Sequence, residues 1–411
     1  MDVNLKYTAL SRLLAVAYFA IVASSATAQQ ITLEQVLQLV SDSHPQLRQQ
    51  ARLVEESSAL VRAAKWQRFP SLSFDYGTSN NNERYSAATV SVPVYEGGAV
   101  SLGSGIQSAE KEMREARIDR VRRDLFEEAA GAFFEAIRAE RSVVITQRSL
   151  GKLNGMRESA VRRVKADVSP AADLDYLDSQ IALQRSSLAN FQGDQALALS
   201  RLKEATGEDL SQQSFSYTAR GINGDHRDIL TRAYRSSAYR SEIDAKIRKS
   251  SLERDKLRAA IKPSVSLNYR EQLTSSLFGV DERQVYLSFN FSTGRGLSYG
   301  SEVLAGDMRL AATRDEAAAF KKVLVRDVEH KLINIERLSS QIPALEQAVA
   351  ARTSMLDSYS RLFATGTRSW LDLLSAESEK YQAELDLHSA EVDLKKSEAV
   401  LALMLGVYDD Q

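Results

Sequence analysis

Residues 70–76 read PSLSFDY, and nearly the same pattern returns 193 positions later as PSVSLNY at residues 263–269. Each copy begins with proline and then alternates polar with apolar side chains, which is the period of a β-strand. A second match follows at an offset of 197, between residues 90–92 and 287–289. Matches in the same order at nearly one offset indicate that the chain contains two copies of one unit.

Two further matches extend the repeat toward the end of each copy. Residues 174–175 (Leu-Asp) correspond to residues 371–372 at an offset of 197, and Gly207 corresponds to Gly406 at 199. We therefore expect two repeats, joined by a polar connector, that form one interleaved unit. The predicted boundaries are 29–210 for the first repeat, 211–223 for the connector and 224–411 for the second repeat.

Each repeat predicts the same order of elements: a helix, two strands, a very long helix, a turn and a last helix. In the first repeat we expect them at about 33–65, 71–76, 89–94, 99–165, 167–170 and 172–205. In the second repeat we expect them at about 226–260, 264–273, 284–292, 298–363, 365–367 and 369–405. The Asn-rich stretch 80–83 predicts a hairpin turn, Thr32 with Gln35 predicts a helix cap, and Pro343 predicts a kink or pause in the second long helix.

The helix lengths predict how the helices pack. At 1.5 Å per residue the long helices reach on the order of 100 Å, and each shorter helix reaches about half of that. One long helix can therefore lie against two shorter helices that are stacked end to end. A rod of that length does not fit inside a globular domain of this size, so we expect an elongated molecule.

The first 28 residues differ in character from the rest. Lys6 and Arg12 give a basic start, residues 13–23 form an apolar run too short to span a bilayer, and residues 26–28 (Ala-Thr-Ala) fit a cleavage site. This pattern predicts a secretory signal peptide at 1–28. No later run holds 18 consecutive apolar residues, so we expect no transmembrane helix in the exported chain.

Composition excludes several classes of function. The 53 basic and 54 acidic residues give a net charge of -1, so the basic surface that a nucleic-acid partner needs is not expected. The chain has no cysteine, which excludes disulfides, thiolate metal sites, thiol nucleophiles and a lipoprotein anchor. The four histidines (44, 226, 330 and 388) are at least 58 residues apart, and no phosphate-binding loop or nucleophile elbow is present. We expect no enzyme activity, no cofactor and no metal site.

The four strands of the two hairpins are about ten residues long and have one apolar and one polar face, which suits a tilted transmembrane β-strand. An ordinary sheet with one buried face is the alternative. Four strands cannot close a barrel, and lipid does not tolerate open sheet edges. A membrane location would therefore require several chains to share one barrel, of eight strands from two chains or twelve from three.

This order of elements resembles the TolC-like outer-membrane factor family over essentially the whole chain after residue 28. The resemblance is carried by the duplicated unit, by Pro70 and Pro263, by residues 92–98 (VPVYEGG) and by residues 366–374 (GTRSWLDLL). It implies a mainly α fold with a small β part, in which duplicated long coiled-coil hairpins join four strands of a 12-stranded barrel shared by three chains.

The resemblance also implies a location and a role. The homotrimer would lie in the outer membrane of a Gram-negative bacterium, in contact with its lipid, and extend into the periplasm. It would be the exit channel of a tripartite export system and would dock on a periplasmic adaptor and an inner-membrane transporter. Residues 369–374 resemble members that serve type I secretion of large adhesins, and small-molecule efflux is the other cargo class.

Family members close the tunnel at its periplasmic tip with acidic residues and a polar network between coiled coils. The matching candidates for constriction and gating in this chain are Asp372, Arg368, Phe363, Asp173 and Ser375. The turns expected to dock partners are formed by Asp167, Val168, Ser169, Thr365, Gly366 and Thr367. A ring of carboxylates at a narrow passage would concentrate cations and repel anions. The alternative is that Asp372 only begins the last helix, where acidic residues are favoured.

Three of these positions depart from the family pattern. Phe363 stands where a tyrosine is expected, so a hydroxyl link is missing. Ser375 stands where a second acidic ring can occur, and Asp167 replaces a glycine in the first turn. We therefore expect a single acidic ring and a closed state that is held less tightly.

Two other functions have a sequence argument. A periplasmic coiled-coil adaptor would carry one helical hairpin flanked by compact glycine-rich β-domains, whereas this chain predicts two hairpins. A fibrous structural coiled coil would show sustained heptads and would leave the duplicated strands unexplained. Either protein would leave the outer membrane without detergent.

Overall fold

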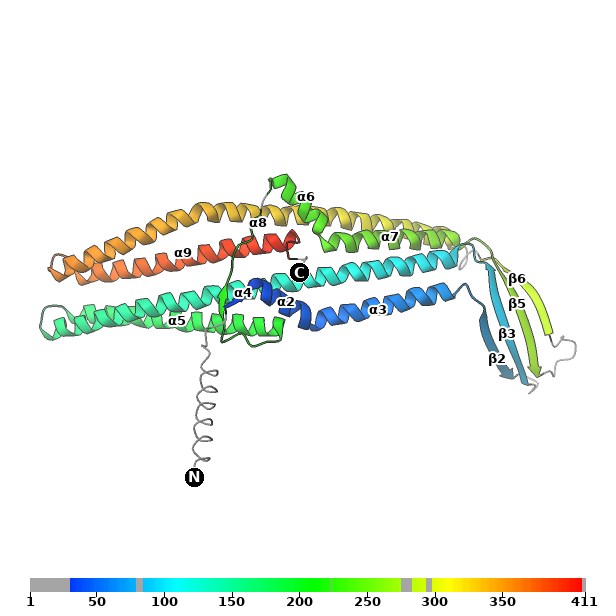
Figure 1. Cartoon of the computed structure of the whole chain (residues 1–411), viewed down its shortest axis with the longest axis horizontal. Helices are drawn as coiled ribbons and strands as arrows, with labels where there is room; N and C mark the ends of the chain where they lie inside the picture. The colour runs from blue at the N-terminus through cyan, green and yellow to red at the C-terminus, as the bar shows by residue number, and fades with distance from the viewer. Residues whose placement is uncertain (1–29, 79–83, 223, 275–282, 293–297, 409–411) are drawn as a thin grey trace, which may run out of the picture. The chain divides into compact units, whose positions relative to one another are not determined.

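The computed structural model describes residues 30–78, 84–222, 224–274, 283–292 and 298–408. The predicted signal peptide and the predicted turn at 80–83 lie outside the described residues. The described chain is mainly helical with a small β part (Figure 1). It separates into two compact units. Unit 1 holds the described residues up to Leu39 together with Gly131–Thr218 and Ala348–Val392, and unit 2 holds the remainder. Both repeats contribute to each unit.

Unit 1 is built around the ends of two helical hairpins. Its elements are β1 (Gln30–Thr32), the start of α2 (Leu33–Ser43), the second half of α4 (Ala99–Lys165), α5 (Ala171–Thr206), β4 (Ser214–Ser216), the end of α8 (Tyr299–Ala364) and most of α9 (Trp370–Met404). β1 and β4 pair in parallel, with Ile31 opposite Phe215. The sequence predicted only a polar connector here. β4 forms because Phe215 packs edge-to-face on Phe133 of α4, with ring centroids 5.5 Å apart.

Unit 2 contains the larger sheet and the helix segments on either side of its hairpins in the sequence. Its elements are the end of α2, α3 (Pro45–Trp66), β2 (Ser71–Thr78), β3 (Arg84–Tyr95), the first half of α4, α6 (His226–Ser236), α7 (Ala238–Ala259), β5 (Ser264–Thr274), β6 (Arg283–Asn290), the first part of α8 and the end of α9. Ile229 and Ala233 of α6 form a buried cluster with Val328 of α8 and with Leu401 and Leu405 of the C-terminal segment. Unit 2 therefore has a core of its own.

The two shorter helices predicted at 33–65 and 226–260 are each broken in two, so these predictions were wrong. In the first, Pro45 begins α3, because proline has no N–H to continue α2, and His44 Nδ1 accepts a hydrogen bond from the Gln46 N–H at 3.3 Å. In the second, Ser237 has extended backbone and its hydroxyl accepts the Arg240 N–H at 3.4 Å. No proline marks that second break.

The long helices and the first cap agree with prediction. α4 is 67 residues long and α8 is 66, and α8 continues through Pro343, so that proline does not end the helix. Thr32 and Gln35 form a reciprocal capping box: the Thr32 N–H donates to Gln35 Oε1 at 2.9 Å and the Gln35 N–H to Thr32 Oγ1 at 3.4 Å. No helix within the described ranges is long and apolar enough to cross a membrane.

The four predicted strands of the two hairpins form one antiparallel sheet in the order β2-β3-β5-β6. The two repeats meet at its centre, where β3 pairs with β5 and Val90 lies opposite Tyr269. β2 and β6 are the edges, and neither has a second partner strand in the described chain. The two hairpins thus combine into one sheet with two open edges.

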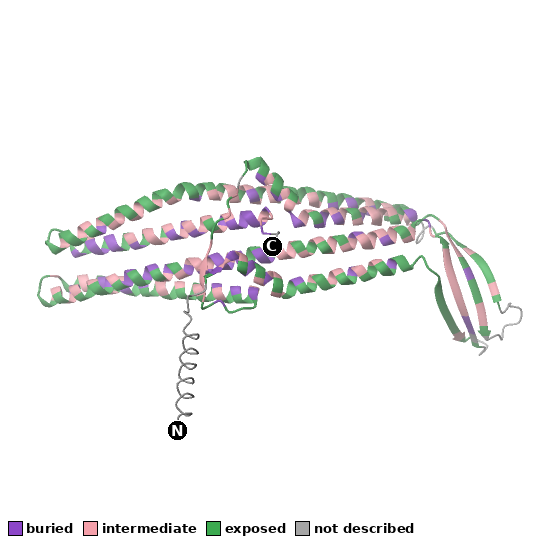
Figure 2. Ribbon diagram, in the orientation of Figure 1, coloured by how far each residue is buried: buried purple, intermediate pink, exposed green. Residues whose placement is uncertain are grey.

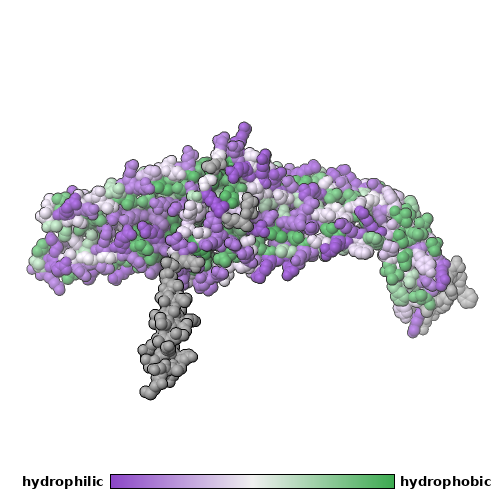
Figure 3. Space-filling view, in the orientation of Figure 1, coloured by the Kyte–Doolittle hydropathy of each residue, from purple (hydrophilic) through white to green (hydrophobic). Residues whose placement is uncertain are grey.

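The two faces of this sheet differ in character. Because paired residues share a face, the register places most of the apolar side chains of the four strands together: Leu72, Phe74, Tyr76, Val90, Val92, Val265, Leu267, Tyr269, Val285, Leu287 and Phe289. At one end of this face the ion pair of Glu271 with Arg283 interrupts the apolar surface. This face is uncovered: Leu72 is 76% exposed and Phe289 72% exposed (Figures 2 and 3). On the other face Ser266 and Ser288 share a hydrogen bond of 2.6 Å, and Asn268 donates to Ser288 at 2.9 Å.

Candidate functional site

The candidate site is the tip of unit 1, where the turn between α4 and α5 lies beside the turn between α8 and α9 (Figure 1). The two turns have the same backbone. Val168 N–H donates to Arg163 C=O at 2.9 Å, and Thr367 N–H donates to Leu362 C=O at 2.9 Å. These bonds close a Schellman motif at the end of each long helix.

Each motif needs a residue in the left-handed region before its closing bond. Gly366 has φ 78° in the second turn, and Asp167 has φ 56° in the first. Asp167 thus has the left-handed backbone that the glycine has at the equivalent place in the second turn. Asp tolerates this region better than most residues, because its short polar side chain can bond locally.

The hydrogen bonds align the two turns at an offset of 199. This makes Asp173 the counterpart of Asp372 and Leu174 the counterpart of Leu373. The sequence match of residues 174–175 with 371–372, at an offset of 197, was therefore wrong by two residues. The error arose because Asp173 follows Ala172 and not a leucine, so the Leu-Asp pair of residues 371–372 found an identical pair only two residues later.

The helices that follow the turns begin differently. In α9 the Asp372 N–H donates to Ser369 Oγ at 3.2 Å, while the Ser369 N–H and hydroxyl donate to Asp372 Oδ2 at 3.1 and 2.8 Å. This is a capping box, so Asp372 does begin its helix. α5 has Pro170 at its N-cap and no side-chain cap bond, and the Asp173 N–H donates to the Pro170 carbonyl at 3.2 Å instead.

The capping box also fixes the charge of Asp372. The two hydrogen bonds from Ser369 lower the pKa of this carboxyl, and the Arg368 guanidinium, with Nη1 3.8 Å from Oδ2, lowers it further. The same guanidinium lies over the Tyr359 ring, 4.6 Å from its centroid. Asp372 is therefore held as an anion at the tip, beside one cation of its own chain.

A second guanidinium joins the two hairpins. Arg163 at the end of α4 lies over the ring of Phe363 at the end of α8, with its Cζ 4.9 Å from the centroid, and its Nε donates to Ser169 Oγ at 3.3 Å. The Phe363 ring in turn packs against Trp370, 5.1 Å between centroids. A cation–π contact thus occupies the place where a tyrosine hydroxyl was expected.

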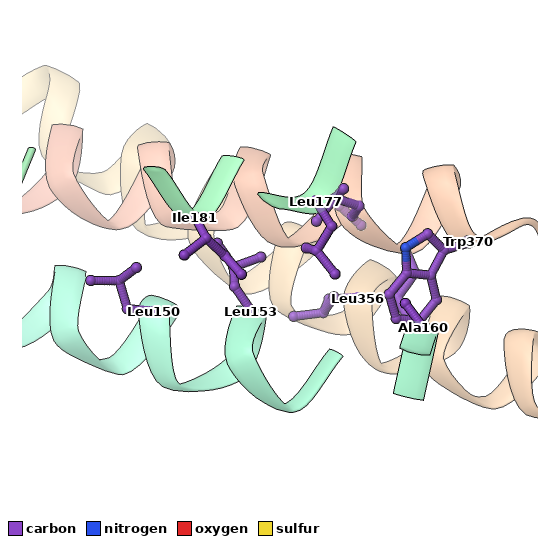
Figure 4. Close-up of a cluster of buried hydrophobic side chains, with 10 residues drawn as sticks. Leu150, Leu153, Ala160, Leu177, Ile181, Leu356 and Trp370 are labelled. Atoms are coloured by element: carbon purple, nitrogen blue, oxygen red, sulfur yellow. The ribbon is translucent and has the colours of Figure 1, made fainter. Parts of the chain in front are cut away.

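Behind this contact the four helices of unit 1 share a buried apolar cluster (Figure 4). Its members are Leu150, Leu153 and Ala160 of α4, Leu177 and Ile181 of α5, Leu356 of α8, and Trp370, Leu373, Leu374 and Ala376 of α9. The Trp370 ring lies next to Ala160 and is 6% exposed. The cluster holds the two hairpins together next to their turns.

The structure brings some predicted site residues together and leaves others apart. Phe363, Arg368 and Asp372 lie in the contacts described above. Asp167, Val168 and Ser375 are exposed at the surface, and Thr365 and Thr367 hydrogen-bond to each other at 3.1 Å. Sequence reasoning missed Arg163, Tyr359 and the role of Trp370. No metal-binding cluster of acidic residues and histidine occurs in the part of the chain that the structure describes.

The comparisons with known proteins bear on both the sheet and the tip. The family model described as "Outer membrane efflux protein" matches residues 36–208 and 241–407, which is most of the chain. The chain belongs to the outer membrane efflux protein family. Its members are channel components of transport systems and not enzymes, and the chain is accordingly an outer-membrane protein that extends into the periplasm.

Individual members of the outer membrane efflux protein family resemble the chain in sequence or in fold. Outer membrane protein TolC of Escherichia coli is 25% identical over 130 residues, which cover 32% of this chain and 26% of that protein. VceC of Vibrio cholerae has a similar fold, with a TM-score of 0.78 and 14% identity, over 91% of this chain and 96% of VceC. The open state of the Neisseria gonorrhoeae channel MtrE gives a TM-score of 0.72 and 18% identity, over 93% of each chain.

Proposed function

We propose that three copies of this chain form the outer-membrane exit channel of a tripartite export system. The observation that carries the proposal is the sheet β2-β3-β5-β6, which has one mainly apolar, uncovered face and, within the described chain, two unpaired edges. Such a face is stable in lipid, whereas open edges are not. The strands of neighbouring copies therefore continue the sheet into a closed barrel.

The internal repeat supports the way the barrel closes. Within one chain the first hairpin pairs with the second through β3 and β5. The equivalent contact between chains is β6 of one copy with β2 of the next, which places Leu287 and Phe289 on the same face as Leu72 and Phe74. Three copies give twelve strands, as the family resemblance implies, and leave room for an aqueous passage.

The tip is the proposed gate and docking end. In a threefold assembly the Asp372 carboxylates come together as a ring that attracts cations. The exposed turns at 167–169 and 365–367 are the surfaces that meet a periplasmic adaptor and an inner-membrane transporter. Docking there separates the hairpins across the contact of Arg163 with Phe363 and widens the ring. The transporter supplies the energy, and this chain supplies the conduit.

The proposed cargo is a protein exported by type I secretion, such as an adhesin. The sequence of residues 369–374, which resembles that of type I secretion members, supports this choice. Small-molecule efflux is the other cargo class that the same conduit serves. Deleting the gene for this chain and comparing the secreted proteins with the resistance to toxic compounds separates the two.

The mass of the detergent-extracted complex tests the assembly. We expect light scattering of the complex extracted from the outer membrane, with the detergent contribution subtracted, to give the mass of three copies of this chain. Extraction by salt or buffer alone, or a one-chain mass at working concentration, would contradict the shared barrel. A periplasmic adaptor or a structural coiled coil would then fit better.

Changing the residues of the second turn tests the gate. We expect the pair Asp372→Ala and Arg368→Ser to raise the single-channel conductance in planar bilayers, because it removes the carboxylate ring and the guanidinium over Tyr359. Asp372→Asn keeps an acceptor for Ser369, so it should lower cation selectivity without opening the tip. Asp357→Ala, an exposed carboxylate on α8, is the control and should change neither. An unchanged conductance in the double variant would refute the gate.

A further inference from the structure

A buried polar layer crosses the tip of unit 1, inward from the turns. Glu377 of α9 has a side chain that is 3% exposed, and its two oxygens accept hydrogen bonds from Ser149 Oγ at 3.2 Å and Lys152 Nζ at 3.3 Å, both on α4. Gln184 Nε2 of α5 donates to the same Ser149 oxygen at 3.1 Å. One carboxylate thereby ties α9 to both helices of the other hairpin.

From this geometry we infer that Glu377 is a positioning residue for the gate. It fixes the register of α9 against the α4–α5 hairpin, and through α9 it sets where Asp372 stands at the tip. The inference rests on the proposed channel function. Glu377 itself touches no cargo and lines no constriction.

The cost of burying this carboxylate argues against a purely stabilising role. Taking a carboxylate and an ammonium out of water costs several kcal/mol per ion, and well-packed apolar residues at the same place are often neutral or better. Lys152 is 38% exposed and keeps its ammonium partly in water, whereas Glu377 does not. A buried polar residue within an apolar seam is best known for fixing register and partner choice.

The duplicated sequence shows why register needs fixing here. At the offset of 199 given by the turns, Ser149, Lys152 and Gln184 correspond to Ala348, Ala351 and Ala383, and Glu377 corresponds to Asp178. Asp178 instead receives two hydrogen bonds from Arg157 within its own hairpin. The polar layer therefore exists at only one of two equivalent helix seams in the described chain. It distinguishes the seam between α4 and α9 from the seam between α8 and α5, which apolar packing alone does poorly.

The polar layer is close enough to the tip to set the position of Asp372. Glu377 follows Asp372 by five residues on the same helix, about 7.5 Å along its axis. Between them lie Leu373, Leu374 and Ala376 of the apolar cluster, which tolerate sliding because apolar contacts are not directional. A slip of α9 by one helical turn would move Asp372 by about 5.4 Å, enough to misalign a ring of three carboxylates.

The test replaces the layer by apolar residues of similar size. The variant Ser149→Ala, Gln184→Leu and Glu377→Leu leaves Lys152 free to reach water. We expect its thermal unfolding midpoint to equal or exceed that of the wild type. Its basal conductance should rise several-fold and spread over several levels. Glu377→Gln keeps one oxygen that can accept from Lys152, and its amide N–H can donate to Ser149 Oγ, so it should resemble the wild type. Glu379→Leu removes an exposed carboxylate of α9 that pairs with Arg352 of α8, and it is the matched control.

A register measurement separates failure of this inference from failure of the channel function. The chain has no cysteine, so spin labels can be placed on Gly151 of α4 and Ser378 of α9, which are both exposed. With labelled chains diluted among unlabelled ones, we expect one narrow distance distribution in the wild type and a broad or split one in the apolar variant. A single wild-type-like distance in that variant, or a fall in its stability together with its conductance, would overturn the positioning role. Absence of conductance in the wild type would instead overturn the channel function.

Discussion

Replacing Trp370 with alanine should lower the free energy of unfolding by about 3–5 kcal/mol, the range for removing a large buried aromatic side chain. Trp370 is 6% exposed, and its ring fills the space between the apolar cluster and Phe363. The cavity left behind would lie where the two hairpins join. Circular dichroism of the detergent-purified protein in a denaturant series would measure the loss, and basal conductance should rise with it.

Two substitutions at and beside this position make the result specific. Leu371 is 47% exposed, so Leu371→Ala should change stability by less than about 1 kcal/mol. The Trp370 indole Nε1 is buried and has no hydrogen-bond partner within the described residues. Phenylalanine carries no such donor, so Trp370→Phe should cost less than about 1.5 kcal/mol. If Trp370→Ala and Leu371→Ala lowered the free energy of unfolding equally, the buried Trp370 ring would not be what stabilises the junction of the hairpins.

The parts of the fold that were predictable are those with a strong local period. Alternation at 70–76 and 263–269 located two strands of the sheet, and long runs of helix-forming residues located two helices of more than 60 residues. The second turn was also predictable, because Gly366 marks a left-handed residue and the residue pair Ser369 and Asp372 marks a helix start.

What escaped prediction depends on contacts between distant residues. The break at Ser237 has no proline and follows from the packing of α6 on α8 and the C-terminal segment. β4 depends on Phe133, which lies 82 residues earlier than Phe215. The contact of Arg163 with Phe363 joins different repeats, where Arg163 corresponds to Leu362, so the internal alignment gave no signal for it. The roles of Asp372, Asp173 and Ser375 in a pore remain predictions, because they depend on the neighbouring copies.

Gly97→Ala should destabilise the junction between the sheet and the long helices by about 2–5 kcal/mol. Gly97 lies two residues after the end of β3 at Tyr95 and has φ +60°, where an L-residue costs about 1–2 kcal/mol. A Cβ at this position would also lie 2.7 Å from Lys262 Cβ, and overpacking of this kind costs about 1–3 kcal/mol. Lys262 stands between α7 and β5, so the added methyl would push the two repeats apart where they enter the sheet.

The neighbouring glycine separates the two causes. Gly98 has φ +93°, but a Cβ there would meet nothing within 4 Å, so Gly98→Ala reports backbone strain without overlap. We expect Gly97→Ala to lower the denaturant midpoint clearly more than Gly98→Ala, and to lower the yield of the proposed trimer as well. Equal shifts would mean that Lys262 moves aside freely and that only the left-handed backbone matters. Because β3 and β5 pair directly beyond this junction, a larger effect at Gly97 would identify it as the point where the duplicated hairpins are locked into one sheet.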